Sequence, residues 1–463
     1  MIRLNRGGIC LNWERKNVMV VGMARSGVAA AQLLVKHGAT PFLVDQKKRE
    51  DLRISLDELD TLPVRWHLGQ EPETLFAQVD AIVISPGVPI QSSFIQKAQE
   101  MGIPVIAELE LGFQLAEGTV VAVSGTNGKT TTVSLLGEIF KNAGKLSYVA
   151  GNIGYPMSAA AMASRREDVI VAEVSSFQLE SIDTFHPKVA ALLNITEDHL
   201  NRHGTMQEYI RMKARLFENQ NSQDVAVLNF DDPILQEMAG QLKSRVAWFS
   251  RSQAVPLGAF VENGKIVCAW GGETRAVCDV DSIYIPGPHN LENALAATAV
   301  AVAMGVPAPV IRHSLRTFQG VEHRIERTRE LNGVTYYNDS KGTNVDSTIK
   351  AVQTMKVPTV IMLGGYDKHT DFAPLAKEIA NSPFMSHAVL LGQTAGQIEK
   401  ALLDAGFDRI TNATTLKDAI DKARSFAVSG GNVLFSPACA SFDMFTDYEQ
   451  RGRIFKEMVN ALV

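Results

Sequence analysis

The sequence predicts an α/β protein of three domains, each built on a mostly parallel sheet. Its 463 residues correspond to about three domains at roughly 150 residues per domain. Short β-branched runs alternate with helical patterns along the chain, which is typical of parallel β-α-β units. This alternation begins afresh after residue 107 and again after residue 320, so we expect domains at 1–107, 108–320 and 321–463.

The first predicted domain opens with a β-α-β unit. A β-branched run over 17–22, a helical pattern over 26–38 and a second run over 40–45 form this unit, and a further strand is expected over 80–85. Ligands of open parallel sheets bind at the carboxyl ends of the strands. We therefore expect the binding residues of this domain at those ends.

The second and third predicted domains repeat the alternation. In the second, a strand over 119–124 precedes a glycine-rich turn and a helix, and a mostly alanine stretch over 291–304 is predicted as a buried core helix. Its later strands are predicted over 168–176, 188–196 and 224–232. The strands of the third are predicted over 333–340, 357–365, 387–393 and 431–438.

Composition excludes several classes of protein. The chain is 46% hydrophobic with a net charge of −5, which argues against a disordered chain and against a basic nucleic-acid-binding protein. The cysteines at positions 10, 268, 278 and 439 form no C-x-x-C pair, so a reducing cytosol is expected rather than a disulfide framework or a zinc site. Charges scattered over residues 1–17 argue against a secretory signal, and we expect no membrane span.

The glycine-rich turn after residue 124 predicts a phosphate-binding loop. Its glycines let backbone N–H groups face phosphate oxygens at the start of a helix, Lys129 can reach the β and γ phosphates, and the Thr130 hydroxyl can bind Mg²⁺. The match to a generic P-loop is incomplete, because Val123 stands where the first glycine is expected. The alternative to a phosphate-binding loop is a glycine-rich turn that happens to precede Lys-Thr and binds no phosphate. The loop residues are Gly125, Thr126, Asn127, Gly128, Lys129, Thr130 and Thr131.

A carboxylate in a buried strand indicates a metal site nearby. Glu173 lies in an otherwise apolar strand, where an unpaired carboxylate is unfavourable. A Mg²⁺ ion would resolve that cost, and the alternative is pairing with a buried arginine or lysine. Asp198 or His199, at the end of the next strand, could reach the same ion.

A lysine interrupts an apolar helical stripe. The stripe contains Met206, Tyr209 and Leu216, and Lys213 takes the position seven residues after Met206. Such a lysine must extend its ammonium group to solvent, pair, lose its charge or be modified, for example by carbon dioxide to a carbamate. The pattern alone favours extension to solvent.

Six motifs together resemble those of the Mur ligases, ATP-dependent amide-forming enzymes of peptidoglycan synthesis. They are GTNGKTT (125–131), EVSSFQLE (173–180), NITEDH (194–199), HNLEN (289–293), EHRIE (322–326) and NDSKGTN (338–344). The resemblance is greatest to the branch that adds D-glutamate to UDP-N-acetylmuramoyl-L-alanine. It implies a Rossmann-like domain for the UDP substrate, a central P-loop ATPase-type domain and a C-terminal Rossmann-like domain for the amino acid, in a monomeric cytoplasmic enzyme.

The resemblance also implies a chemistry. ATP would phosphorylate the substrate carboxylate, and the amino group of D-glutamate would attack the acyl phosphate. Thr130 and Glu173 match ligands of one Mg²⁺, His199 matches a ligand of a second, and Lys213 falls on a carbamylated lysine, which reverses the preference for extension to solvent. The implied catalytic residues are Lys129, His199, Lys213, His323 and Lys341. The implied ATP contacts outside the loop are Asn290, Asn293, Arg324 and Asp339.

The turn at Gly22–Gly27, followed by Asp45, also fits a dinucleotide fingerprint with Ala24 in place of the second glycine. A nicotinamide-dependent oxidoreductase is therefore an alternative, although Ala24 would obstruct a pyrophosphate. By resemblance the turn binds UDP. The implied contacts of the UDP substrate are Arg25, Ser26, Asp45, Gln46, Lys47, Ser85, Pro86, Gly87, Asn152, Ser175 and His199.

The third domain carries the implied amino-acid site. A cation facing the side-chain carboxylate is what an acidic amino acid requires, and Lys368 matches that residue. Cys439 is interpreted as a small packing residue rather than a nucleophile. The chain lacks the D-N-P-R signature of the diaminopimelate-adding branch. The implied D-glutamate contacts are Thr343, Lys368, Ser441, Phe442 and Tyr448.

Two further alternatives remain. A folate polyglutamating ligase is disfavoured because it lacks the N-terminal UDP domain. A non-catalytic nucleotide-binding regulator would bind ATP without substrate-stimulated hydrolysis.

Overall fold

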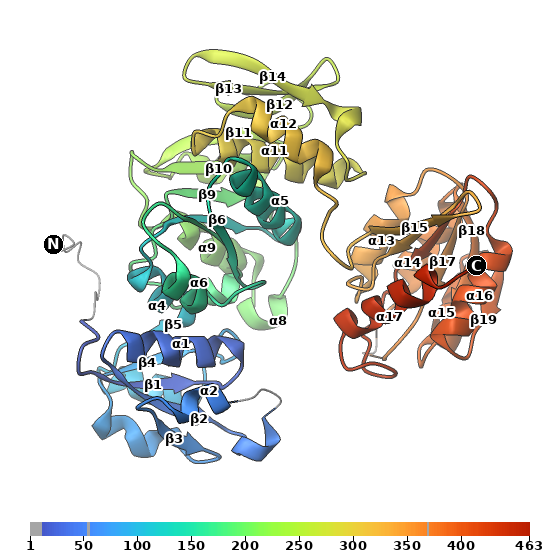
Figure 1. Cartoon of the computed structure of the whole chain (residues 1–463). Coiled ribbons are helices and arrows are strands. Elements are labelled where there is room, and N and C mark those ends of the chain that lie inside the picture. Colours follow the sequence, from blue (N-terminus) through green and yellow to red (C-terminus); the bar gives the residue numbers. More distant parts are fainter. Residues whose placement is uncertain (1–11, 53–55, 368–369) are drawn as a thin grey trace. The chain divides into compact units, whose positions relative to one another are not determined.

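The computed structural model describes residues 12–52, 56–367 and 370–463. They form two compact units, the first running to Ile283 and including His289–Thr317, and the second made of Tyr284–Pro288 and Phe318–Val463 (Figure 1). Within the described residues, the first unit holds two sheets and the second holds one. The α/β class with parallel-rich sheets is confirmed, and the boundaries near residues 107 and 320 stay predictions. The N-terminal segment 1–11, with Cys10, and Lys368 lie outside the described residues.

The N-terminal sheet has the order β3-β2-β1-β4-β5, and all its strands are parallel. Val18–Val21 is buried throughout, as expected for a strand covered on both faces. Its strands are β1 (Asn17–Val21), β2 (Thr40–Asp45), β3 (Arg65–Leu68), β4 (Ala81–Ile84) and β5 (Val105–Ala107). Its helices are α1 (Arg25–Lys36), α2 (Asp57–Asp60) and α3 (Ser93–Glu100), with short 3-10 turns at Arg49–Asp51 and Pro72–Gln78.

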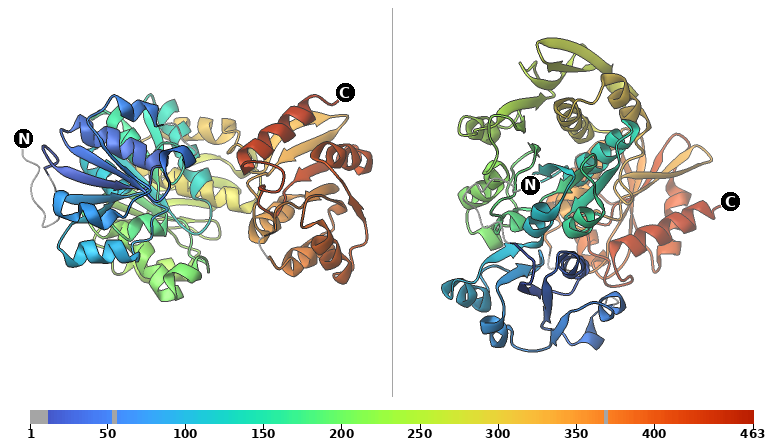
Figure 2. Two further views of the ribbon diagram at one scale, coloured as in Figure 1. Left: turned by 90° about the horizontal axis from the view of Figure 1, so that it is seen from below. Right: turned by 60° about the vertical axis from the view of Figure 1, so that its left-hand side comes forward.

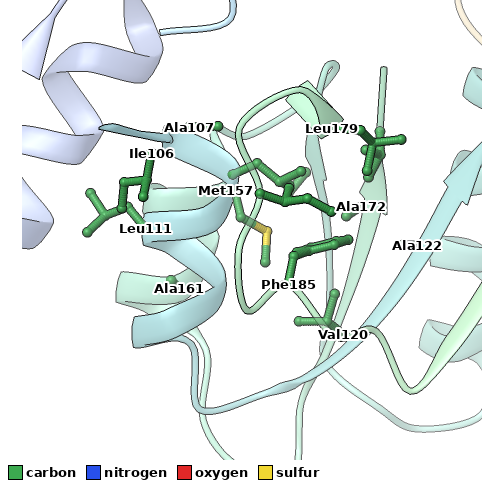
Figure 3. Packing of buried hydrophobic residues seen from close by; sticks show 14 of the residues in the cluster. Ile106, Ala107, Leu111, Val120, Ala122, Met157, Ala161, Ala172, Leu179 and Phe185 are labelled. Carbon is green, nitrogen blue, oxygen red and sulfur yellow. The ribbon is translucent and has the colours of Figure 1, made fainter. Parts of the chain in front are cut away.

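Helix α4 (Glu108–Leu115) connects this sheet to the next one and packs against α6 (Met157–Ala163). A Cβ at Gly112 would lie 2.7 Å from the backbone carbon of Met157, so the two helices approach as closely as a glycine allows. Leu111, Met157 and Phe185 belong to one hydrophobic cluster, which extends from the N-terminal sheet into the central sheet (Figure 3). The two sheets of the first unit therefore share a core.

The buried carboxylate of Glu110 adds a polar connection to that core. Its oxygens accept hydrogen bonds from the backbone N–H groups of Asp183, Thr184 and Phe185 at 2.9 Å each, and from the Thr184 hydroxyl. A buried carboxylate is tolerated where donors satisfy it in this way.

The central sheet has nine strands in the order β14-β13-β12-β11-β10-β9-β6-β8-β7. Its strands are β6 (Thr119–Ser124), β7 (Ser147–Gly151), β8 (Val169–Glu173), β9 (Val189–Leu192), β10 (Val225–Asn229), β11 (Arg245–Ser250), β12 (Gly258–Glu262), β13 (Lys265–Trp270) and β14 (Glu273–Asp279). Its remaining helices are α5 (Lys129–Asn142), α7 (Ser176–Leu179), α8 (Leu200–His203), α9 (Met206–Ala214), α10 (Pro233–Ala239), α11 (Pro288–Ala303) and α12 (Ala308–Thr317). Short 3-10 turns lie at Arg215–Phe217 and Val280–Ser282.

The central sheet ends in an antiparallel meander, β12-β13-β14, which was not predicted from the sequence. Two pairs of residues with positive φ make its turns, Asn263-Gly264 at 50° and 71° and Gly271-Gly272 at 62° and 83°. Asn-Gly and Gly-Gly favour such two-residue hairpin turns, because their backbone twist matches that of the strands. The signal was present in the sequence.

The buried core helix predicted over 291–304 is confirmed as α11, which begins three residues earlier at Pro288. Its residues Ala294–Ala297 are fully buried. None of the helices in the described ranges combines the length and the apolar character needed to cross a membrane.

The sheet of the second unit has the order β15-β16-β20-β17-β18-β19, parallel except for β15. Separate hydrophobic clusters lie on its two faces, and helices cover both (Figure 2). Its strands are β15 (Glu326–Leu331), β16 (Val334–Asn338), β17 (Thr359–Leu363), β18 (Met385–Leu390), β19 (Ile410–Asn412) and β20 (Asn432–Phe435). Its helices are α13 (Val345–Thr354), α14 (Ala373–Asn381), α15 (Ala395–Asp404), α16 (Leu416–Phe426) and α17 (Tyr448–Asn460).

Candidate active site

The loop between β6 and α5 has the geometry of a phosphate-binding turn. Gly125 and Gly128 have φ values of 150° and 86°, which favour glycine, and Gly128 is the N-cap of α5. The side chain of Asn194, at the end of β9, fixes the loop by accepting from the Asn127 N–H at 2.8 Å. The loop thus presents a helix N-terminus at the carboxyl end of the sheet, as the sequence predicts.

Lys129 folds back over this loop. Its ammonium nitrogen donates to the carbonyl oxygens of Gly125 and Thr126, both at 2.8 Å. On the other side, Asn293 of α11 approaches the loop so closely that a Cβ at Gly128 would lie 2.3 Å from its Oδ1. The Asn293 amide also donates to Asn290 at 3.3 Å. The predicted phosphate and adenine residues of the first unit therefore lie together.

Glu173 meets the start of α5. It is 2% exposed, its Oε2 accepts from the Thr130 hydroxyl at 2.9 Å, and its Oε1 accepts from the Asn152 amide at 2.8 Å. Both carboxylate oxygens of Glu173 therefore accept from neutral donors. The alternative, in which Glu173 pairs with a buried arginine or lysine, is not found.

The donors around Thr130 fit Mg²⁺, because a carboxylate and a hydroxyl at the head of a phosphate loop are the oxygen ligands that this ion prefers. Within residues 12–52, 56–367 and 370–463, no group of three or more His, Cys, Asp or Glu side chains is arranged to hold a metal. A metal site here would therefore combine Glu173 with the Thr130 hydroxyl and with ligands other than His, Cys, Asp or Glu side chains.

His199 lies at the same edge of the sheet, as the N-cap of α8 with φ 54°. Its imidazole ring lies 4.8 Å from the ring of Phe177 in α7, the helix that follows β8 and begins after Ser175. The side chain is 48% exposed and its Nε2 lies 3.5 Å from Asp198. It is thus accessible to a ligand at the strand ends.

Lys213 is buried with 1% exposure, so extension to solvent, which the apolar stripe alone favoured, is wrong. Its Nζ donates to the carbonyl oxygen of Gly125 at 2.9 Å and contacts the Ser124 hydroxyl at 3.4 Å. Burial holds the pKa of Lys213 well below its usual value, the positive charge of Lys129 lowers it further, and two carboxylates oppose the shift. The apolar stripe predicted that Lys213 lies on the inner face of its helix, but not that its side chain stays buried there.

Tyr209 is a site residue that sequence reasoning treated only as apolar. Its ring lies 4.8 Å from the Lys213 Nζ, and its hydroxyl is 3.2 Å from that of Thr126 in the phosphate loop. Burial raises the pKa of Tyr209 to about 12, so the hydroxyl keeps its proton. The available signal was a tyrosine, with its polar hydroxyl, four positions before the lysine on the same helix face.

The UDP candidates of the N-terminal sheet converge at the ends of β1, β2 and β4. Asp45 accepts from the Met23 N–H and the Lys47 N–H at 2.8 and 2.9 Å. Ser85 donates to the Gly22 carbonyl oxygen at 2.8 Å. The Asp45 oxygens are therefore engaged with the chain's own backbone. Arg25 and Ser26 begin α1, and Gln46, Pro86 and Gly87 lie in the turns after β2 and β4.

The second unit brings together its own group of candidates. Asp339 is buried after β16 and accepts from the Ser436 hydroxyl at 2.6 Å and the Ile325 N–H at 3.1 Å. Burial raises the pKa of Asp339 to about 6, against these hydrogen bonds and the charge of Arg324. The Lys341 Nζ lies 5.6 Å from the ring of Tyr448.

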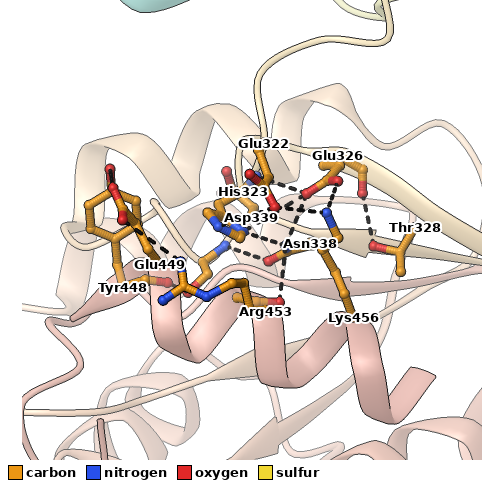
Figure 4. A network of polar contacts seen from close by, with 12 residues as sticks. Glu322, His323, Glu326, Thr328, Asn338, Asp339, Tyr448, Glu449, Arg453 and Lys456 are labelled. Atoms are coloured by element: carbon orange, nitrogen blue, oxygen red, sulfur yellow. Dashed lines mark hydrogen bonds and ion pairs between the residues drawn. The ribbon is translucent and has the colours of Figure 1, made fainter. Parts of the chain in front are cut away.

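His323 lies inside a polar network (Figure 4). It is 3% exposed, has φ 65°, and its Nδ1 is 2.9 Å from the Asn338 amide nitrogen. Lys456 of α17 donates to both Glu322 and Glu326 beside it, at 3.0 and 2.6 Å. Burial lowers the pKa of His323, although the two glutamates oppose the shift.

The predicted amino-acid residues follow the ends of β16 and β20. Ser441 is buried, whereas Phe442 is 59% exposed and faces the ring of Tyr366 at 6.1 Å. Thr343 lies two residues after Lys341 in the turn before α13. Lys368 lies outside the described residues. Tyr366, the aromatic neighbour of Phe442, was not predicted as a site residue, although it stands in the sequence segment 364–368 together with Lys368.

Comparison with known proteins gives three family models in the order of the predicted domains. Residues 16–107 match the MurD-like N-terminal domain of Mur ligases, residues 123–301 the Mur ligase middle domain, and residues 323–439 the glutamate ligase domain of Mur ligases. Together they account for most of the chain.

Two full-length relatives are named UDP-N-acetylmuramoylalanine--D-glutamate ligase. The protein of Alkaliphilus oremlandii is 45% identical over 98% of this chain and 100% of its own length. That of Clostridioides difficile is 44% identical over the same shares.

Solved structures of lower identity share the fold. The UDP-N-acetylmuramate-alanine ligase MurC of Thermotoga maritima has a TM-score of 0.61 at 18% identity, covering 96% of this chain and 100% of its own. MurF of Acinetobacter baumannii has a TM-score of 0.61 at 20% identity, covering 91% of each chain.

Proposed function

Because the chain belongs to the Mur ligase family, we propose that it joins D-glutamate to UDP-N-acetylmuramoyl-L-alanine in the cytoplasm, with conversion of ATP to ADP and phosphate. The observation that carries the ligase proposal is the buried contact between Thr130 and Glu173 at the head of the phosphate loop, with Lys213 behind the same loop. The D-glutamate specificity is supported by the full-length relatives named for that amino acid. The oxidoreductase and the non-catalytic regulator have no comparable support.

The reaction needs an activated carboxylate, because a carboxylate is a poor electrophile without a leaving group. In the proposed mechanism a carboxylate oxygen of UDP-N-acetylmuramoyl-L-alanine attacks the γ phosphorus of ATP, and ADP leaves. The neutral amino group of D-glutamate then attacks the acyl phosphate. The tetrahedral intermediate loses the amine proton and expels inorganic phosphate, leaving the amide.

The residues of the first unit would bind and orient ATP. The N–H groups of Thr126 and Asn127 already bond to Asn194, so the N–H groups at the start of α5 would bind the phosphates, and Lys129 would exchange its bonds to Gly125 and Thr126 for phosphate oxygens. Asn293 and Asn290 would contact the adenine. Mg²⁺, held by Thr130 and Glu173, would neutralise charge on the transferring phosphoryl group.

We further propose that Lys213 carries a carbamate. Its depressed pKa favours the neutral amine, which is the form that reacts with carbon dioxide. A carbamate would supply a negatively charged oxygen ligand next to the loop, and with His199 it would hold a second Mg²⁺ ion. The Lys213 Nζ lies at the Gly125 carbonyl oxygen, which supports this placement.

The remaining assignments follow the predicted sets. Asn152, Ser175 and the strand-end residues of the N-terminal sheet would bind the UDP substrate. Arg324 and Asp339 would contact ATP, His323 and Lys341 would belong to the catalytic centre, and the chain would act as a monomer. The D-glutamate contacts would be Thr343, Lys368, Ser441, Phe442 and Tyr448.

An amino-acid panel tests the proposal. The purified chain is incubated with ATP, Mg²⁺, UDP-N-acetylmuramoyl-L-alanine and one amino acid at a time, and phosphate release and the ligated product are measured. Turnover is expected with D-glutamate and not with L-glutamate, L-alanine or diaminopimelate. Strong turnover with another amino acid and none with D-glutamate would overturn the assignment.

A further inference from the structure

A buried arginine in α17 connects the strand-end loops of the second unit. Arg451 is 2% exposed. Its Nε donates to the Ser340 hydroxyl at 3.0 Å and its Nη2 to the Ser340 carbonyl oxygen at 2.7 Å. Its Nη1 donates to the carbonyl oxygens of Cys439 and Ala440 at 3.1 and 3.2 Å. One side chain therefore holds the loop after β16 and the loop after β20.

A third loop joins the same arrangement. The Ala440 carbonyl oxygen that Arg451 binds also accepts from the Tyr366 N–H at 2.9 Å, in the loop after β17. A Cβ at Gly365 would lie 2.4 Å from that oxygen and 3.3 Å from the Arg451 Nη1. The three loops are thus packed around the guanidinium with no room for a side chain at residue 365.

The loop after β20 needs such support. Ala438 has φ 61°, a left-handed conformation that costs about 1 kcal/mol or more for a residue with a Cβ. Strained backbone persists where surrounding contacts determine it. Arg451 binds the carbonyl oxygens of the next two residues, directly before Ser441.

The buried guanidinium makes no direct ion pair, although the carboxylates of Asp443 and Asp339 lie near enough to interact with its charge. All four acceptors are uncharged, and no carboxylate in the described part of the chain forms an ion pair with the guanidinium. A guanidinium stays protonated in a protein, so the positive charge persists when buried. In surroundings of low dielectric constant, such a charge attracts an anion strongly.

We propose that Arg451 is a positioning residue of the amino-acid site, which clamps the loops carrying Thr343 and Ser441 and whose buried positive charge favours an amino acid with two carboxylates. The proposal rests on the proposed D-glutamate function. The loops after β16 and β20 carry the predicted D-glutamate contacts Thr343, Ser441 and Phe442, and Tyr448 begins the helix of Arg451 itself.

The test compares Michaelis constants in three variants of the full chain. Arg451→Met removes the charge and the fork of donors, and Arg451→Lys keeps the charge but not the fork. Arg329→Met is the matched control: Arg329 also donates to three carbonyl oxygens, those of Val459, Asn460 and Leu462, but at the far end of α17. D-Glutamate, ATP and UDP-N-acetylmuramoyl-L-alanine are varied in turn, and thermal unfolding is recorded.

Arg451→Met is expected to raise the KM for D-glutamate by about tenfold or more. The KM for ATP should rise less than this, and the KM for the UDP substrate should stay within about twofold of the wild-type value. The KM for D-glutamate of Arg451→Lys should lie between the values of Arg451→Met and the wild type. Arg329→Met should leave all three Michaelis constants unchanged. A purely structural role would reduce the amount of folded enzyme, which lowers the apparent kcat and leaves KM unchanged.

An unchanged KM for D-glutamate in Arg451→Met, or an equal rise in all three values, would overturn the role of Arg451. If Arg451→Met does not fold, Arg451→Lys decides by the same criterion. Wild-type enzyme that ligates no D-glutamate would overturn the proposed function and this inference together. Wild-type turnover with unaffected variants would overturn only the inference.

Discussion

Lys213 in the first unit and Arg451 in the second are both buried cations at the carboxyl ends of parallel strands, yet their surroundings differ. The Lys213 Nζ has one carbonyl oxygen at 2.9 Å and a hydroxyl at 3.4 Å, whereas the Arg451 guanidinium has four acceptors between 2.7 and 3.2 Å. Burial lowers the pKa of Arg451 only to about 10, but it lowers the pKa of Lys213 well below the usual value. Arg451 thus keeps its charge at neutral pH, and Lys213 is set to lose it.

The difference shows how a buried amine and a buried guanidinium serve different purposes. A lysine with few acceptors is destabilised as an ammonium ion and becomes a nucleophile for modification. An arginine with a full set of acceptors is fixed in place, keeps its charge and positions its neighbours. Two predictions separate these two roles directly, and two more test the buried groups around Arg451.

The largest effect is expected for Lys213→Ala. If a carbamate on Lys213 holds a metal, the alanine variant should lose activity by about a thousandfold or more, ~4 kcal/mol of transition-state stabilisation. Short carboxylic acids or bicarbonate should restore part of it by filling the cavity. Phosphate release with and without added acid is the measurement. Arg211→Ala, at an exposed position of the same helix, is the control, and full activity of the lysine variant would exclude a role for the carbamate.

Stability should respond in opposite directions to Lys213→Met and Arg451→Met. The arginine variant leaves three carbonyl oxygens and a hydroxyl without their donor, so we expect a loss of about 3 kcal/mol in the free energy of unfolding. The lysine variant replaces a buried amine, whose charged form burial disfavours, by an apolar side chain of similar length, so its stability should be unchanged or higher. Urea unfolding measures both. Equal losses in the two variants would show that the two sites do not differ as described.

The pH dependence of stability should report the buried carboxylate of the second unit. Burial holds the pKa of Asp339 at about 6 against a usual 3.8, so the folded chain binds this proton more tightly than the unfolded chain. Its contribution to stability is therefore lost as the pH rises from about 4 to about 6, by at most about 3 kcal/mol.

Asp339→Asn should flatten the fall in stability between pH 4 and pH 7, measured as the midpoint of thermal unfolding. Asp80→Asn is the control, because the ion pair with Lys16 lowers the pKa of Asp80 and moves its titration below this window. A difference in stability between wild type and Asp339→Asn that does not change between pH 4 and pH 7 would contradict the assignment.

The smallest effect is expected for Cys439→Ala. Arg451 binds the backbone oxygen of this residue and not its sulfur, so the side chain should be dispensable and activity should stay within about twofold. Burial raises the pKa of the Cys439 thiol to about 11, and a buried thiol reacts slowly with alkylating agents. Mass spectrometry after alkylation and a ligation assay check both points. Inactivation by alanine would indicate a chemical role for the thiol.

Features encoded in one contiguous segment were predictable from the sequence. The phosphate loop is a local pattern of strand, glycines and helix, and the place of Lys213 within the apolar stripe follows from the spacing of its neighbours, although that spacing wrongly favoured extension of the side chain to solvent. The parallel sheets follow from the alternation of runs and helices, and the meander could have been predicted from Asn263-Gly264 and Gly271-Gly272.

Features that depend on distant segments were not predictable. Asn194 fixes Asn127 across 67 positions, and Arg451 binds Ser340 across 111 positions. Nothing in the sequence around Arg451 distinguishes it from a solvent-exposed helical arginine, because its acceptors are backbone oxygens supplied by loops elsewhere. A sequence pattern shows which residue types are present but not which carbonyl groups face them.

The hydrophobic cluster beneath α4 has a consequence for cooperativity. Because apolar residues from Trp13 to Met238 pack as one cluster, the N-terminal and central sheets cannot expose their interiors separately. Glu110 ties the connecting helix to Phe185 in the same region. The three sheets of the described residues should therefore melt in a calorimeter as two cooperative units. An isolated N-terminal fragment ending at residue 107 should be strongly destabilised, since one of the two hydrophobic clusters of its sheet continues into residues that come later in the sequence.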